Sequence, residues 1–254
     1  MEAIKNFKPS IILFSLGFLG VASIVPLIPQ LLALNPEPLP FSIEMIQIIS
    51  LVQSSVLLVL MLWLGSVFSK KVELTAPVIF ALARSENALE KFKPQIIPAL
   101  IGGVAGGIFI LMFLGALSRY LPSEFLAAGE TFTPPWYTKM LYGGITEELL
   151  IRWGLMSFFV WVTYRLTQEN DSEIRSHNYV IAIILSALIF GLGHLPVAFA
   201  LSPEVTAPLV AYIILGNAAF GFIAGYLYWK HGLECAIAAH MIAHITMIIG
   251  TSFA

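Results

Sequence analysis

Seven long apolar runs limit what this chain can fold into. A helix needs about 20 predominantly apolar residues to cross a hydrocarbon core about 30 Å thick. Runs of about that length cover Ser10–Leu34, Met45–Phe68, Ile96–Leu117, Trp136–Tyr164, Tyr179–Ala200, Ala207–Trp229 and Leu233–Ser252. With 58% hydrophobic and 11% charged residues, the chain lacks the charged surface of a soluble protein. The sequence therefore predicts an all-α, polytopic transmembrane helix bundle of about seven spans.

The first run has features that need a separate interpretation. Lys5 and Lys8 precede it, as in a secretory signal, but the run is long and has no small-residue cleavage site. We therefore expect an uncleaved first span. Pro26 and Pro29 predict a kink in it, because proline removes a helix hydrogen bond.

The positive charges are distributed unevenly among the connections. With the N-terminus inside, the inner segments hold Lys5, Lys8, Lys70, Lys71, Arg84, Lys91, Lys93, Arg165, Arg175 and Lys230, whereas the outer side holds Arg119 and Lys139. Cytoplasmic connections accumulate Lys and Arg, so we expect a cytoplasmic N-terminus and, after an odd number of spans, an outer C-terminus. No eukaryotic targeting tail is visible, and we expect a prokaryotic plasma membrane.

We expect two parts of the chain. Residues 1–133 hold the N-terminal spans and an inner loop near 69–95, and residues 134–254 hold the last four spans. Leu82, Leu89 and Phe92 predict that part of the inner loop forms an amphipathic helix.

Net charge and cysteine content exclude some partners. A formal net charge of -2 argues against nucleic acid. The single cysteine, Cys235, cannot form an intrachain disulfide and provides no cysteine zinc motif. The expected partners are the bilayer and a membrane-associated substrate.

Ionisable groups in the fourth run are the first functional candidates, because they are expensive inside a bilayer and need partners. Glu148 and Arg152 are four residues apart, share a helix face and can pair. Glu147 lies about 100° around the helix and needs a partner from another span. A purely structural interpretation is that Glu148 and Arg152 form an ion pair that fixes helix packing.

Three histidines lie in later runs. His194 follows Gly191 and Gly193 in the fifth run, where glycine permits close helix approach or an irregular backbone. His240 and His244 are four apart on one face of the seventh. A single buried histidine is more often a packing residue, but three near carboxylates favour a site.

Such a cluster can activate water for attack on a carbonyl. A buried carboxylate or an imidazole can act as general base. The remaining imidazoles can orient the water, donate to the oxyanion, or bind a metal that acidifies the water. The sequence leaves these alternatives open, with zinc as the candidate metal.

Three motifs occur in one order on separate spans: Glu147-Glu148-x-x-x-Arg152, Phe190-x-x-x-His194 and His240-x-x-x-His244. This pattern resembles the CPBP family of intramembrane proteases, which includes the type II CAAX prenyl endoproteases and the Abi or bacteriocin-processing relatives. The resemblance covers the chain from about Tyr137 to Thr251.

The resemblance implies an intramembrane endopeptidase acting on a peptide or lipidated protein. It implies that Glu147 and His194 activate water, that Glu148 and Arg152 support the site, and that His240 with His244 stabilises the oxyanion. Many members have Asn or Asp where this chain has His244, so a metal set of Glu147, His194, His240 and His244 stays open. Some members cleave after a prenylated cysteine and others process peptides.

Other function classes use similar residues. A transporter or proton relay also places Glu and His inside a bundle, although no internal repeat is evident. A b-type haem protein could use His194 with His240 or His244, which would leave the Glu-Glu-x-x-x-Arg segment unexplained. A catalytically inactive membrane scaffold is the third alternative.

Overall fold

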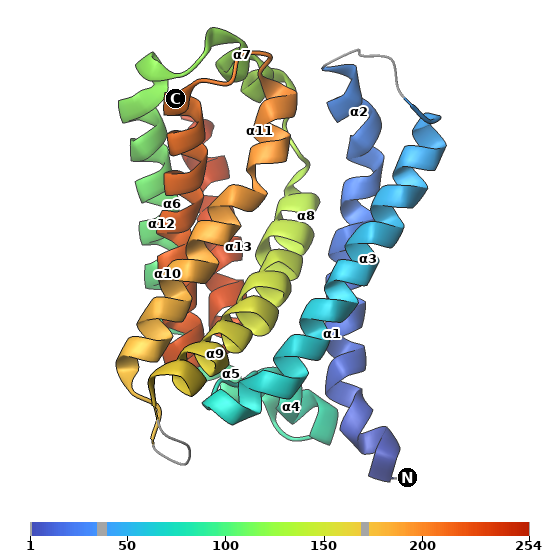
Figure 1. The fold of residues 1–254 in the computed structure, drawn as a ribbon, viewed down its shortest axis with the longest axis vertical. Coiled ribbons are helices and arrows are strands. Elements are labelled where there is room, and N and C mark those ends of the chain that lie inside the picture. Colours follow the sequence, from blue (N-terminus) through green and yellow to red (C-terminus); the bar gives the residue numbers. More distant parts are fainter. Residues whose placement is uncertain (1, 35–39, 169–172, 254) are drawn as a thin grey trace.

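The computed structural model describes residues 2–34, 40–168 and 173–253, and the regular elements within these ranges are all helices (Figure 1). Seven helical spans are long and apolar enough to cross a membrane, which confirms the predicted all-α bundle. The helices that build these spans are α1 (Glu2–Ile24), α3 (Ile43–Phe68), α6 (Ile96–Leu117), α8 (Trp136–Thr138), η5 (Lys139–Thr146), η6 (Leu149–Met156), α9 (Ser157–Thr167), α10 (Ser176–Gly193), α12 (Ala207–His231) and α13 (Leu233–Thr251).

Short helices complete the connections and span ends. They are η1 (Val25–Leu27), α2 (Ile28–Ala33), η2 (Ser69–Val72), α4 (Pro77–Arg84), α5 (Ala88–Phe92), η3 (Lys93–Gln95), η4 (Ser118–Tyr120), α7 (Ser123–Thr131) and α11 (Leu195–Leu201). The sequence did not predict α7. The side chain of Lys5 lies outside the described residues, and the predicted orientation and two-part division stay predictions.

The fourth span, from α8 to α9, lies at the centre of the bundle. Its η5 segment packs against α1 and α13, and its η6 segment packs against α3, α10 and α12. The helices α6, α10, α12 and α13 gather on one side of it, and α1 and α3 lie on the other (Figure 1). With 44% of its apolar window buried, it is the most buried of the seven spans. Residues on this span can therefore meet partners from both sides.

Two spans are interrupted at prolines. The first changes from α1 into the 3₁₀ turn η1 at Pro26 and continues as α2, which confirms the predicted kink. The fifth span was predicted as one uninterrupted helix, Tyr179–Ala200, and the predicted continuity is wrong. The α-helix ends at Gly193, His194 forms a turn with its N–H donating to Gly191 O at 3.2 Å, and α11 restarts at Leu195. The cause is Pro196 in the first turn of α11, which cannot continue the hydrogen-bond ladder of α10.

Close packing of α6 on α13 depends on small residues. A Cβ added at Gly103 would lie 2.5 Å from Ala239 O, and one added at Gly107 would lie 2.8 Å from Ala243 O. The glycines thus let the two helix backbones come into close contact. This contact fixes the helix that carries His240 and His244.

The inner loop folds into two short helices, α4 and α5. Leu82 and Leu89 are both exposed, which agrees with the amphipathic character expected there. Glu234, at the start of α13, accepts a hydrogen bond of 2.8 Å from the Ile79 N–H in the first turn of α4. A carboxylate at a helix N-terminus compensates its unpaired N–H groups. Glu234 therefore caps α4 and anchors the inner loop on α13.

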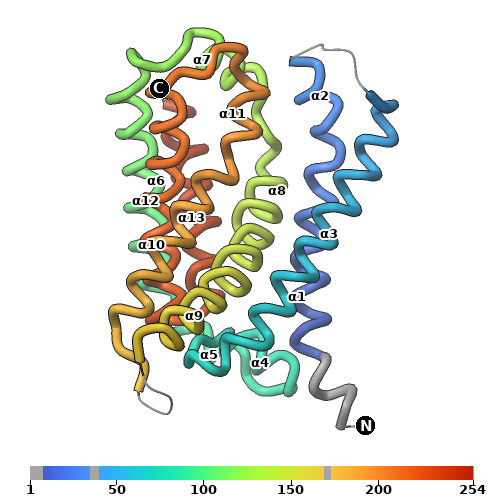
Figure 2. Tube along the Cα trace, viewed as in Figure 1, coloured from blue at the N-terminus to red at the C-terminus, as the bar shows by residue number. Residues whose placement is uncertain are grey.

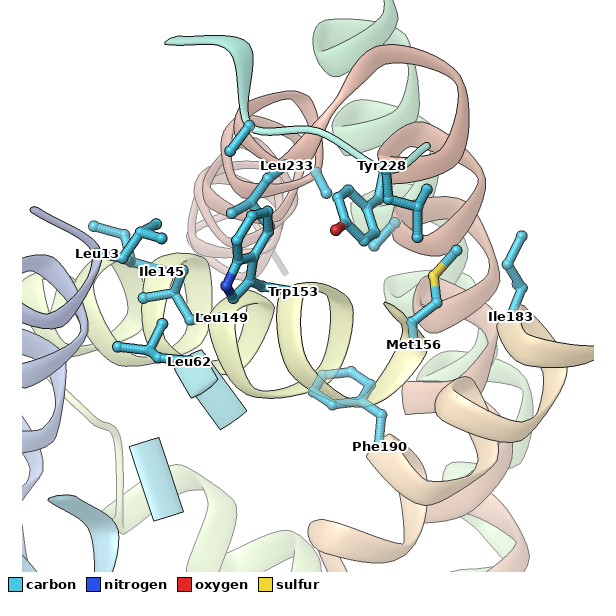
Figure 3. Packing of buried hydrophobic residues seen from close by; sticks show 14 of the residues in the cluster. Leu13, Leu62, Ile145, Leu149, Trp153, Met156, Ile183, Phe190, Tyr228 and Leu233 are labelled. Carbon is cyan, nitrogen blue, oxygen red and sulfur yellow. The ribbon is translucent and has the colours of Figure 1, made fainter. Parts of the chain in front are cut away.

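The largest hydrophobic cluster surrounds the fourth span. Trp153, which is 1% exposed, lies within it together with Leu13, Leu149 and Leu233 from three different parts of the chain (Figure 3). The tube in Figure 2 shows how α1, the fourth span and α13 approach one another at this level. Apolar packing therefore holds the N-terminal helices to the last four spans.

The α6–α13 contact generates a stability prediction. We expect Gly103→Ala to lower the free energy of unfolding by about 1–3 kcal/mol, because the new methyl group forces two backbones apart. Gly115→Ala on the same helix is the control, since nothing lies within 4 Å of its added Cβ. Because alanine forms helices better than glycine by about 1 kcal/mol, the control should be neutral or stabilising. Denaturant titration in detergent measures both variants, and equal stability would contradict the packing argument.

Candidate active site

The acidic pair lies where the fourth span leaves α-helical geometry. Glu147 and Glu148 separate two π-helical segments, η5 and η6, in which backbone hydrogen bonds span five residues instead of four. The sequence analysis assumed α-helical spacing here, and this assumption is wrong. π-Helical insertions are rare and occur frequently at functional sites.

Glu148 is held on two sides. Its Oε2 lies 3.2 Å from Arg152 Nε, and its Oε1 lies 2.8 Å from His240 Nδ1. The side chains of Glu148 and Arg152 are both 0% exposed, and the Arg152 guanidinium also lies 5.0 Å from the ring centre of Phe190. The predicted Glu148–Arg152 pair is present, and it fixes a histidine from the seventh span.

Glu147 lies close to histidines from two other spans, as its position on the helix predicted. Its Oε1 lies 3.8 Å from His194 Nε2, and its Oε2 lies 4.0 Å from His240 Nε2. The His194 ring is oriented by its other nitrogen, since Nδ1 lies 2.8 Å from Phe190 O. The Glu147 side chain is 17% exposed and that of His194 is 33% exposed, so both reach the cavity described below.

His244 lies beside this group without joining its ion pairs. Its ring stacks on that of His240 with centroids 4.9 Å apart and an angle of 12° between the planes. A Cβ added at Gly143 would lie 2.5 Å from His244 Nε2, so the glycine leaves the room that this ring occupies. All six residues singled out from the sequence are thus brought together at one level of the bundle.

A cavity of about 610 Å³ opens onto Glu147, His194, His240 and His244. Its other walls come from η1, α2 and α3, and from the segment that follows α7. The N-terminal spans, which the sequence analysis left without a role, therefore form part of the site.

Several polar cavity residues were missed by the sequence analysis. They are Ser50, Gln53, Ser54, Lys139 and Tyr142, together with Asn217, which was interpreted as packing. The first three stand at positions i, i+3 and i+4 of an otherwise apolar helix, and this pattern could have revealed a polar face. The sequence analysis used Lys139 only as one of the positive charges on the outer side of the membrane.

The metal alternative is not decided by these contacts. Within the described part of the chain, no group of three or more His, Cys, Asp or Glu side chains is placed to hold a metal ion. Glu147 lies 3.8 Å from His194 and 4.0 Å from His240, slightly farther than two atoms that share one tetrahedral zinc ion. Zinc at this site stays a prediction.

A match to a known protein family covers this same region. Residues 129–246 match a family described as type II CAAX prenyl endopeptidase Rce1-like. This part of the chain is similar to that family. The Rce1-like region contains all six residues named above, which confirms the family resemblance and indicates a CAAX-type intramembrane protease. No curated protein and no solved structure matches the chain.

The buried ion pair generates a second stability prediction. Arg152→Met leaves the Glu148 carboxylate buried without a counter-charge, and we expect the free energy of unfolding to fall by about 3–5 kcal/mol. Replacing both partners, as in Glu148→Gln with Arg152→Met, should recover much of this loss.

The exposed pair between Lys93 and Glu90, 2.6 Å apart with both side chains more than half exposed, provides the control. Lys93→Met should change stability by less than about 1 kcal/mol. Detergent-solubilised variants are compared by denaturant titration. A loss for Arg152→Met no larger than that for Lys93→Met would show that the buried pair does not support the site.

Proposed function

We propose that this protein is an intramembrane endopeptidase that hydrolyses a peptide bond of a membrane-associated or prenylated substrate by water activated at Glu147 and His194. The observation that carries the proposal is the convergence of one carboxylate and two oriented imidazoles from three spans on one cavity. The Rce1-like match supports the protease class.

The hydrogen bonds of the two imidazoles suggest their protonation. A carbonyl oxygen only accepts, so His194 Nδ1 carries the proton that it donates to Phe190 O. His240 Nδ1 donates in the same way to Glu148 Oε1, and the other oxygen of this carboxylate lies beside Arg152. In the neutral rings both Nε2 atoms are then acceptors that face Glu147.

This arrangement suits a water molecule. The contacts of 3.8 and 4.0 Å are too long for direct hydrogen bonds, and a water that donates one proton to Glu147 can donate the other to one of the two Nε2 atoms. Glu147 takes a proton from that water as the water oxygen bonds to the substrate carbonyl carbon, and the carbonyl electron pair moves to its oxygen. When the tetrahedral intermediate collapses, the C–N bond breaks and Glu147 returns the proton to the amine nitrogen.

The oxyanion needs a hydrogen-bond donor. His240 Nε2 is an acceptor in the tautomer above, so His244 is the better donor of the pair. Its Nε2 is buried beside Gly143 and has no hydrogen-bond partner among the described residues. We propose that His244 donates to the oxyanion.

The alternative functions fit these contacts less well. A haem between His194 and His240 would have to displace Glu147, which approaches both rings within 4.0 Å. A proton relay could use the same three groups, but it would not require a cavity of about 610 Å³ beside them. Peptide cleavage distinguishes the endopeptidase from both the relay and the inactive scaffold.

Replacing Glu147 tests the proposed function. Glu147→Gln keeps the shape of the side chain but cannot accept the proton, so we expect kcat to fall by about 10²–10⁴-fold. Cleavage of prenylated and unmodified peptides by the detergent-purified protein is followed by mass spectrometry.

Glu234→Gln is the matched control, because Glu234 is a buried carboxylate outside the cavity whose amide would still accept from Ile79 N–H. The control should cleave like wild type, and both variants should remain folded in thermal unfolding. Wild-type rates in the Glu147 variant would rule out its role as base.

Lys139 suggests which end of the substrate enters the cavity. It is the one Lys or Arg among the described residues that line the cavity. It precedes Glu147 by eight positions, or at most about 12 Å along the helix. In a C-terminal C-a-a-X motif, cleavage after the modified cysteine leaves three residues, which span about 10 Å when extended. We propose that Lys139 binds the free C-terminal carboxylate of such a substrate.

Paired peptides test the role of Lys139. A peptide with a free carboxylate three residues beyond the cleaved bond is compared with its C-terminal amide. We expect wild type to prefer the acid by about tenfold or more in kcat/KM, because a hydrogen bond between charged groups is strong. In Lys139→Met this ratio should fall to near one. A preference that persists in the variant would remove Lys139 from carboxylate recognition.

A further inference from the structure

A second, smaller cavity lies beside Trp153 of the fourth span, on the side of the inner loop. It measures about 130 Å³ and lies between α1, the end of α3 with η2, α4 and η6. Its polar lining residues are Ser10, Ser66, Ser69, Lys70, Arg84 and Trp153. It shares no lining residue with the larger cavity, so it is a separate feature.

Two of the residues that line this cavity carry a buried hydrogen-bonding group without a protein partner. Ser69 and Trp153 are each 1% exposed, and within the described part of the chain neither Ser69 Oγ nor Trp153 Nε1 makes a hydrogen bond. Leaving a buried donor unpaired is unfavourable, so such groups point to a ligand. Both can donate to an oxygen acceptor.

The protein is shaped to keep these donors at the cavity. A Cβ added at Gly65 would lie 2.2 Å from Trp153 Nε1, so the indole reaches α3 only because this residue is glycine. On the other wall, α4 is fixed by the hydrogen bond between Ile79 N–H and Glu234, and Arg84 lies in its last turn. Two walls of the cavity, the Trp153 side chain and α4, are therefore held in place by packing and hydrogen bonding outside it.

The charges at the cavity favour an anion. Lys70 and Arg84 line it, and none of the described residues that line it is acidic. Neither cation forms an ion pair with another described residue. Two cations with several hydroxyl and N–H donors match the oxygens of a phosphate group.

The position of Lys70 indicates where this anion comes from. The second span covers Ile43–Val72, 30 residues, or about 45 Å of helix, which equals a bilayer with its headgroups. Lys70 lies two residues from the end of that span, and therefore at the level of the lipid headgroups. Inner-leaflet anionic lipids attract basic residues at this level.

We propose that the second cavity binds a phosphate group, supplied by the headgroup of an anionic lipid on the side of the inner loop. The phosphate oxygens accept from Ser69 Oγ and Trp153 Nε1, and Lys70 and Arg84 balance the charge. The bound headgroup joins α1, α3, α4 and the fourth span at one point. The proposal is independent of the endopeptidase mechanism, because it involves no residue of the larger cavity.

Native mass spectrometry of the delipidated full-length protein, titrated with dioleoyl-phosphatidylglycerol, tests the proposal. We expect one tightly bound lipid, and about tenfold weaker binding in Ser69→Ala, which removes one donor without changing a charge. Lys70→Met should also weaken binding. Lys71→Met is the matched control, since its ammonium lies over the Phe68 ring instead of in the cavity, and it should bind like wild type within about twofold.

Thermal unfolding with and without lipid distinguishes a binding role of Ser69 from a structural one. Without lipid its buried hydroxyl is unpaired, so Ser69→Ala should leave the thermal midpoint unchanged or raise it by about 2 °C or more. With phosphatidylglycerol, wild type should gain more in midpoint than the variant. A merely structural role for Ser69 would instead lower the midpoint under both conditions.

Two further probes separate the sources of phosphate. Dioleoylglycerol, which lacks the phosphate, should not bind at this cavity, and binding as tight as that of phosphatidylglycerol would overturn the proposal. Stabilisation by inorganic phosphate alone, dependent on Ser69, would support the phosphate site and overturn the lipid as its source. Equal binding of phosphatidylglycerol by wild type, Ser69→Ala and Lys70→Met would overturn the site itself.

Discussion

The buried contact between Arg152, Glu148 and His240 is the constraint on which the rest of the structure depends. A carboxylate that is 0% exposed inside an apolar bundle is unfavourable without a counter-charge, and Arg152 supplies it from the same span. Glu148 can then hold His240 at 2.8 Å, which joins the fourth span to α13 and leaves His240 Nε2 facing Glu147. One pair thus stabilises the helix packing and orients His240 toward Glu147, so a structural role and the proposed functional role of the pair are compatible.

Much of the fold follows from composition and length, because an apolar run of about 20 residues has few alternatives to a membrane span. The spans, the kink at Pro26 and the packing role of Gly103 and Gly107 were predictable for this reason. The gathering of the ionisable residues was also predictable, since each needs a partner in the bilayer. The π-helical geometry around Glu147 was not, because it depends on packing against neighbouring helices and not on residue type alone.

Other features were hidden because they depend on tertiary structure. The turn at His194 needs Pro196 after two glycines, and the sequence alone allowed either close helix approach or an irregular backbone there. Lys139 and Gln53 carry no motif, and they become informative only when the spans that hold them face the same cavity. Ser69 is an ordinary serine in sequence, and only its burial without a partner distinguishes it.

The fourth span connects two sites that lie toward opposite ends of the bundle. The larger cavity extends toward α2 and α11, whereas the smaller one lies beside α4 near the N-terminal end of α1 (Figure 1). With the predicted orientation, the larger cavity faces the outer half of the membrane and the smaller one the inner headgroups. Trp153, next to Arg152 in sequence, lines the inner cavity, while Glu147 lines the outer one. A headgroup that fixes Trp153 would therefore restrain the same span that positions Glu147 and Glu148, and lipid binding would act on the proposed active site through one helix.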